Sequence, residues 1–169
     1  MIIGVHCVTR LHDPRRMWPK EYWVELLRGL IDKYYCAIMF IGAFQPIDVK
    51  YVEDIIFHLD PDRVLFEPRQ TTLNEDAVLM KMMDVLICLN SAPMAIATAI
   101  GTPVFGIVGY GPASVTLPVR LDVGWIEDPG LADYDPEHPA RYTARMNEIA
   151  PQDVFRRVVS LLENLRNSA

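Results

Sequence analysis

The chain has 169 residues, of which 51% are hydrophobic and 22% are charged, and its net charge is −6. This length predicts a single domain over residues 1–169, large enough to form a core without cross-links. The negative charge argues against nucleic-acid binding, and no apolar run approaches the about 20 residues that a transmembrane helix needs.

The three cysteines, Cys7, Cys36 and Cys88, lie within apolar runs and form no close pair in the sequence. We therefore expect buried, reduced thiols rather than disulfides or a zinc site. Reduced thiols favour a cytoplasmic location, and residues 1–5 lack the basic region of a signal peptide. The four histidines show no metal-ligand spacing, so we expect neither a metal nor a cofactor.

Short apolar runs alternate with amphipathic segments, which predicts alternating strands and helices. In chain order the expected elements are strand 2–8, helix 21–33, strand 37–41, helix 49–59, strand 63–66, helix 73–83, strand 85–89, helix 92–100, strand 104–108 and helix 152–165. Residues 124–145, rich in proline, aspartate and glutamate, are predicted to be irregular. This order predicts an α/β fold, a Rossmann-like parallel sheet of five or six strands with helices on both faces.

Ligands of open α/β sheets bind at the carboxyl ends of the strands, which draws attention to three loops. The loop after the first strand, residues 9–19, holds Arg10, Arg15 and Arg16. Guanidinium groups bind phosphate through two parallel hydrogen bonds, so this loop could hold a diphosphate. The alternative interpretation is a solvated basic loop.

The second loop, residues 90–94, joins a buried strand to a helix, with Ser91 placed to cap that helix. The N-terminus of a helix is a ready anion site, although most strand–helix junctions are only capped helices. The third loop, residues 109–114, contains Gly109 and Gly111. These glycines permit close approach of a ligand to the backbone, or simply make a turn.

Three stretches of the chain together resemble one known family. Residues 16–19, Arg-Met-Trp-Pro, are similar to its basic-x-Trp-Pro segment, and residues 72–84 are similar to one of its helices. Residues 90–103 read NSAPMAIATAIGTP and resemble the signature D-[ST]-G-x-x-H-[LI]-A-A-A-x-G-x-P. The chain thus resembles the C-terminal half of glycosyltransferase family 9, the ADP-heptose:lipopolysaccharide heptosyltransferases. Asn90, Ala92 and Ala95 replace the acidic residue, glycine and histidine of that signature, and Arg16 stands where lysine is usual.

The resemblance implies one half of a GT-B type enzyme, whose active site lies between two Rossmann-like domains. This half would bind the donor, a nucleotide-diphospho-sugar similar to ADP-heptose, for synthesis of lipopolysaccharide or a related glycan. Arg16 and the helix N-terminus after Ser91 would neutralise the leaving diphosphate, Thr9 would hydrogen-bond it, and no metal would be required. The substrate-binding residues implied are Thr9, Arg10, Arg16, Asn90, Ser91, Ala92, Met94 and Gly109.

The catalytic base would come from the acceptor-binding half, which precedes this region in the family and is absent from the 169 residues. We therefore assign no catalytic residue and expect the isolated chain to be inactive. We also expect exposed apolar residues where that half or another chain would dock, or where the domain self-associates. The candidates are Trp18, Tyr110, Val115 and Leu117.

Two other interpretations remain open. The lost signature residues favour a degenerate, non-catalytic module of the same fold, used for binding or assembly. A different sugar-nucleotide enzyme of similar architecture, such as an epimerase, is supported by fold analogy alone.

Overall fold

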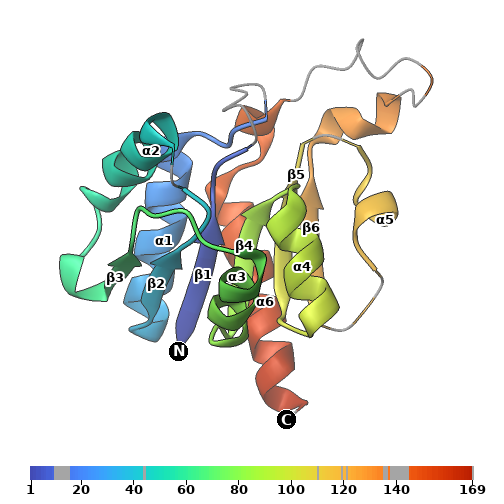
Figure 1. Cartoon of the computed structure of the whole chain (residues 1–169). Helices are drawn as coiled ribbons and strands as arrows, with labels where there is room; N and C mark the ends of the chain where they lie inside the picture. The colour runs from blue at the N-terminus through green and yellow to red at the C-terminus, as the bar shows by residue number, and fades with distance from the viewer. Residues whose placement is uncertain are drawn as a thin grey trace.

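The computed structural model describes residues 1–9, 16–43, 45–109, 111–118, 120, 122–134, 137 and 145–168. Its centre is a sheet of six parallel strands in the order β3-β2-β1-β4-β5-β6 (Figure 1). The strands are β1 (Ile2–His6), β2 (Ala37–Phe40), β3 (Val64–Phe66), β4 (Val85–Leu89), β5 (Val104–Val108) and β6 (Val123–Glu127). The expected parallel α/β sheet is confirmed.

Helices cover both faces of the sheet (Figure 1). On one face lie α1 (Lys20–Tyr34), α2 (Pro46–Ile56) and α6 (Pro151–Asn167). On the other lie α3 (Leu73–Lys81), α4 (Ala92–Ile100) and the short α5 (Ala113–Thr116). Short 3-10 helices occupy Pro61–Arg63, Pro129–Asp133 and Met146–Glu148. None of the helices in the described ranges combines the length and apolarity that a bilayer crossing requires.

The local sequence explains why these helices form where they do. Apolar stripes on α1 and α6 pack against one face of the sheet, and both helices carry an acidic residue in the first turn and a basic residue in the last. Helix α3 begins with a capping box between Thr72 and Glu75. Helix α4 ends at Gly101, whose φ of +81° is the left-handed conformation that glycine adopts without strain.

Strand β6 corrects the expectation that residues 124–145 are irregular. It pairs with β5 along five residue pairs, from Val104 with Val123 to Val108 with Glu127. Gly124 faces the ring of Phe105, where an added Cβ would lie 3.0 Å from Cδ2. The strand therefore depends on its pairing with β5, the preceding strand, and lacks a strong pattern of its own.

The order of the strands places a topological switch point on the carboxyl edge, where β1 and β4 lie side by side. From β1 the chain builds outward through β2 and β3, then crosses back so that β4 pairs with the other side of β1. The loops after β1 and β4 therefore leave the sheet side by side and turn toward opposite faces. Ligands of open α/β sheets bind at such a switch point.

Candidate functional site

Arg16, at the described end of the loop after β1, meets the chain at the start of α4 beside this switch point. The Nη2 atom of Arg16 lies 3.5 Å from the carbonyl oxygen of Asn90, although 74 positions separate them in the sequence. The Arg16 side chain is half-buried. The structure thus brings together the two features that the sequence predicted as parts of one anion site. Arg10 lies outside the described residues.

Trp18 holds the Arg16 segment in place. Its ring is fully buried and packs edge-on against Trp23, with 5.0 Å between ring centroids. Its Nε1–H donates to the carbonyl oxygen of Ile149 at 2.9 Å, and its own carbonyl accepts from the Tyr51 hydroxyl. The Trp-Pro segment is therefore an anchor that ties the loop after β1 to α2 and to the chain before α6.

This burial corrects the expected docking surface. Trp18 was expected to be exposed and is buried, because its indole N–H finds an acceptor inside the protein. Leu117 was also expected to be exposed and is buried in the core beside α4 and α5. Tyr110 and the side chain of Val115 lie outside what the structure describes. Within the part of the chain that the structure describes, the exposed large apolar residues are instead Met1, Tyr35, Ile47, Phe57, Leu65, Leu73, Val78 and Met82.

Thr9 lies just beyond β1 and is buried. Its hydroxyl lies 3.5 Å from the sulfur of Met17, a weak acceptor. Hydrogen bonding of Thr9 to a ligand stays a prediction, and the hydroxyl would lose little by leaving its present partner.

Ser91 occupies the N-cap position of α4, but its side chain does not cap the helix. Its hydroxyl donates to the carbonyl oxygen of Leu89 at 2.9 Å and lies 3.1 Å from Nδ1 of His6. The expected capping bond is therefore wrong. The reason is competition, since two other polar groups lie within reach of the same hydroxyl.

The first turn of α4 offers few amides to an anion. Pro93 has no N–H, and the N–H of Met94 donates to the Ser91 carbonyl at 3.1 Å. The Met94 side chain is buried in the core, while Ala92 and Ala95 are exposed. Among the described residues, Arg16 therefore brings a full positive charge to the start of α4. Contacts of Asn90, Ala92 and Met94 with a ligand stay predictions.

Gly109, at the end of β5, has a packing partner. A Cβ added at Gly109 would lie 2.0 Å from the sulfur of Met146, so the methionine fills the space that a side chain would need. This packing alone accounts for the glycine. Contact of Gly109 with a ligand stays a prediction.

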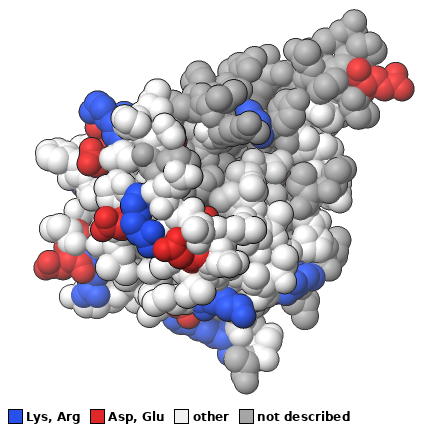
Figure 2. Space-filling model, viewed as in Figure 1, with Lys and Arg blue, Asp and Glu red and all other residues white. Residues whose placement is uncertain are grey.

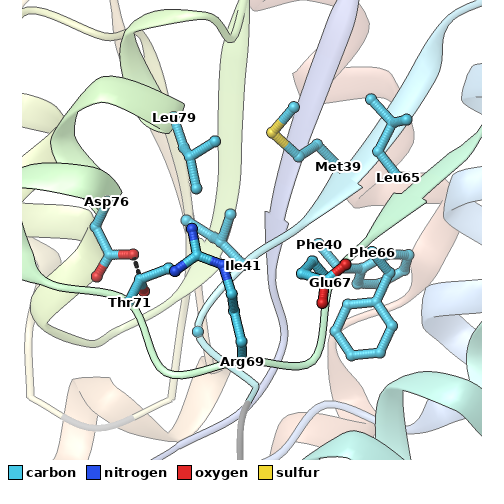
Figure 3. A pocket seen from close by; sticks show the side chains of 11 residues that line it. Met39, Phe40, Ile41, Leu65, Phe66, Glu67, Arg69, Thr71, Asp76 and Leu79 are labelled. Atoms are coloured by element: carbon cyan, nitrogen blue, oxygen red, sulfur yellow. Dashed lines mark hydrogen bonds between the residues drawn. The ribbon is translucent and has the colours of Figure 1, made fainter.

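A cavity of about 340 Å³ opens between the ends of β2 and β3 and helix α3 (Figure 3). Its apolar wall includes Met39, Ile41 and Leu79. Its polar groups are Glu67, Arg69, Thr71 and Asp76, with the Thr71 hydroxyl donating to Asp76 at 2.5 Å. In Figure 3 the Arg69 side chain rises from the loop after β3 beside Ile41 and Thr71.

Sequence reasoning missed this cavity, because its lining comes from three segments that only the fold assembles. One available signal was the polar stretch directly after the predicted strand at 63–66, at the carboxyl edge where ligands bind. The loop from Glu67 to Thr71 supplies the rim. Over the face of the molecule shown in Figure 2, acidic and basic side chains are interspersed, so the polar rim does not belong to a broad field of one sign.

A family model described as glycosyltransferase family 9 (heptosyltransferase) matches residues 1–126, which include β1 through β5 and nearly all of β6. The chain belongs to glycosyltransferase family 9. In this family 9 chain, the stretch 90–103 that resembles the signature forms the start of α4, the whole helix and the turn into β5. The departures at Asn90, Ala92 and Ala95 all fall at or just before the start of α4, and Asn90 is the one that contacts Arg16. No curated protein sequence matches the chain.

Solved structures of similar fold include two heptosyltransferases and a family 9 glycosyl transferase. The E. coli ADP-heptose lps heptosyltransferase II is 22% identical, with a TM-score of 0.73 over 99% of this chain and 47% of that one. A glycosyl transferase family 9 protein from Veillonella parvula is 18% identical, with a TM-score of 0.75 over 96% and 46%. The E. coli heptosyltransferase WaaC with ADP is 15% identical, with a TM-score of 0.72 over 95% and 43%. This family 9 chain spans less than half the length of each.

Proposed function

We propose that this chain binds the nucleotide-diphospho-sugar donor of a glycosyl transfer reaction in the synthesis of lipopolysaccharide or a related glycan. The observation that carries the proposal is the meeting of Arg16 with the start of α4 at the switch point between β1 and β4. Family membership supports it, and so does the ADP named with the E. coli heptosyltransferase WaaC structure.

The diphosphate would lie against Arg16. The guanidinium is half-buried, and attraction between charges is stronger there than in open water. It would form charge-assisted hydrogen bonds to phosphate oxygens, with the positive end of the α4 dipole beside it. Because Pro93 and Met94 leave few free amides in the first turn, the arginine carries more of this interaction than the helix does.

The nucleoside would lie in the cavity beside β2 and β3. Its volume of about 340 Å³ falls within the range of small-molecule sites, and its apolar wall suits a planar base. The carboxylates of Glu67 and Asp76 in its rim would repel phosphate but accept hydrogen bonds from an amino or hydroxyl group. Arg69 in the same rim pairs with Glu75 at 3.1 Å. The two ends of the donor are therefore assigned by charge, with phosphate toward Arg16 and the nucleoside toward the two carboxylates.

In the transfer step, an acceptor hydroxyl would attack the anomeric carbon of the donor sugar. The bond from that carbon to the diphosphate oxygen would break, and the electron pair would leave with the diphosphate. Arg16 would stabilise the charge that develops there. The base that takes the hydroxyl proton would come from an acceptor-binding half or another chain. The buried thiols suit a reducing compartment, so we place this chemistry in the cytoplasm.

The second candidate is a non-catalytic binding or assembly module. The observation that favours it is the pair of exposed alanines, Ala92 and Ala95, where the signature has glycine and histidine. A histidine donor to the diphosphate is worth roughly 1.5–3 kcal/mol, or about 10–150-fold in affinity.

Calorimetric titration of ADP, UDP and inorganic pyrophosphate into the native chain separates the two candidates. Binding of a nucleoside diphosphate more tightly than pyrophosphate supports a donor site with both ends in use. No binding of any of them at millimolar concentration removes the donor proposal and favours the module.

A further inference from the structure

His6 closes β1 at the carboxyl edge, yet only 6% of its surface is exposed. Its Nδ1 atom lies 3.1 Å from the Ser91 hydroxyl oxygen, 85 positions further along the chain. That hydroxyl also lies 2.9 Å from the carbonyl oxygen of Leu89, which can only accept a hydrogen bond. The imidazole thus belongs to a chain of polar contacts that ends on β4, immediately before α4.

Counting protons assigns the direction of each bond. The Ser91 hydroxyl has one proton, and donation to Leu89 uses it. The contact with His6 is then satisfied only if Nδ1 carries the imidazole proton and donates to Ser91. Burial lowers the pKa of His6 to about 4, against a smaller opposing effect of a hydrogen bond involving its own backbone, so the ring is neutral near pH 7. Its Nε2 atom is then unprotonated.

The opposite edge of the ring packs against Gly42, which follows β2 and has a φ of +79°. A Cβ at Gly42 would lie 2.6 Å from Cδ2 and 2.8 Å from Nε2 of His6, so no side chain fits there. Gly42 also lines the cavity assigned above to the nucleoside. One imidazole therefore touches the wall of the cavity on one side and the residue before α4 on the other.

We propose that His6 is a positioning residue of the donor site, which fixes the start of α4 relative to the cavity wall at Gly42. It does so by donating to the Ser91 hydroxyl, which is itself bonded to the Leu89 carbonyl at the end of β4, so that the residue at the start of α4 is held from two sides. This inference rests on the proposed function. It requires that His6 affect a ligand that spans both subsites more than one that fills the cavity alone.

The test compares ADP with adenosine, which lacks the phosphates, in calorimetric titrations. His6→Leu removes the donor and should weaken ADP binding about tenfold, as the loss of one hydrogen bond implies, with adenosine binding unchanged within about twofold. His6→Asn places an amide N–H near the position of Nδ1 and should restore most of the ADP affinity. Exposed His58 provides the matched control, and His58→Asn should bind both ligands as the native chain does.

Ser91→Ala removes the other partner and keeps the test decisive if His6→Leu does not fold. It should weaken ADP binding by a similar factor, and the double variant should bind no more weakly than either single variant. In the native chain, ¹⁵N chemical shifts of the imidazole should show a protonated Nδ1 on His6. Failure of the native chain to bind ADP, UDP and pyrophosphate would remove the proposed function and this inference with it. ADP binding that is equal in His6→Leu, Ser91→Ala and the native chain would overturn only the inference.

Discussion

The guanidinium of Arg16 lies 3.5 Å from the carbonyl oxygen of Asn90, so the loop after β1 touches the residue before the α4 cap. The contact exists because β4 pairs with β1 and not with β3, its predecessor in the chain. It places a fixed positive charge beside the helix N-terminus.

Trp18 should govern both stability and the placement of Arg16. Trp18→Phe keeps an aromatic ring but leaves the Ile149 carbonyl without its donor, which should cost about 1–3 kcal/mol of unfolding free energy. Trp18→Ala should cost about 3–5 kcal/mol through the cavity it creates. Urea unfolding measures both values. Trp125→Phe, at a partly buried tryptophan on β6, is the control. A loss in Trp18→Phe no larger than in the control would show that the Ile149 bond is not an anchor.

Filling the cavity should separate the two ends of the donor site. Leu79→Trp places a larger ring in the wall and should weaken ADP binding by about tenfold or more, while pyrophosphate binding stays within about twofold. Val78→Trp, on the adjacent and 62% exposed position of α3, makes the same change away from the cavity and should bind both as the native chain does. Equal loss of both ligands in Leu79→Trp would mean that the nucleoside does not occupy this cavity.

Burial of neutral His6 should make stability depend on pH. The folded chain holds the pKa of His6 at about 4, below the unfolded value of 6.5, so only the unfolded chain takes up the proton between these values. The stabilisation is complete above about pH 6.5 and is lost as the pH falls toward 4, by roughly 3 kcal/mol in all. His6→Asn should flatten this part of the pH profile. Urea midpoints that fall equally in both proteins between pH 6.5 and 4.5 would place the proton uptake elsewhere.

The chain alone should not transfer sugar. On the proposed function, the site at β1 and β4 would supply groups for the leaving diphosphate, and the base for the acceptor would come from another domain or chain. Positioning of both reactants is a large part of the rate, and a site divided between two domains is not completed by one of them. Incubation with a panel of sugar nucleotides and lipid or sugar acceptors should therefore show no product. Repeated turnover by the isolated chain would show that the base lies within these 169 residues.

The β4–α4 junction illustrates what the sequence determines locally. Residues 85–89 and 92–100 were predicted with their observed bounds, because a continuous apolar run makes a buried strand and Gly101 with Pro103 ends the helix. The loops that hold Arg16 and Asn90 were both predicted at the carboxyl edge, since each follows a strand of one parallel sheet, and the pairing of β4 with β1 brings the two residues together. By contrast, β6 was missed because its pairing with β5 stabilises a segment whose own pattern is weak.

The contacts of His6 and Ser91 show where local inference ends. Ser91 was predicted to cap α4, as its residue type and position favour, but the fold brings His6 within reach of its hydroxyl. No spacing in the sequence signals that contact, because 85 positions separate the two residues. The same holds for the cavity, whose wall combines residues of β2, β3 and α3. Trp18 was misassigned to the surface because its acceptor, Ile149, lies 131 positions away.

The most direct test of the donor site is the affinity of ADP for the native chain and for two arginine variants. Arg16→Ala removes the charge beside α4, whereas Arg166→Ala removes one at the far end of α6, next to Met1. We predict measurable ADP binding by the native chain and by Arg166→Ala, and at least about a tenfold loss in Arg16→Ala, as expected for one charge-assisted hydrogen bond. Equal binding by all three proteins, or no binding by the native chain at millimolar ADP, would contradict the assignment of the diphosphate to the switch point between β1 and β4.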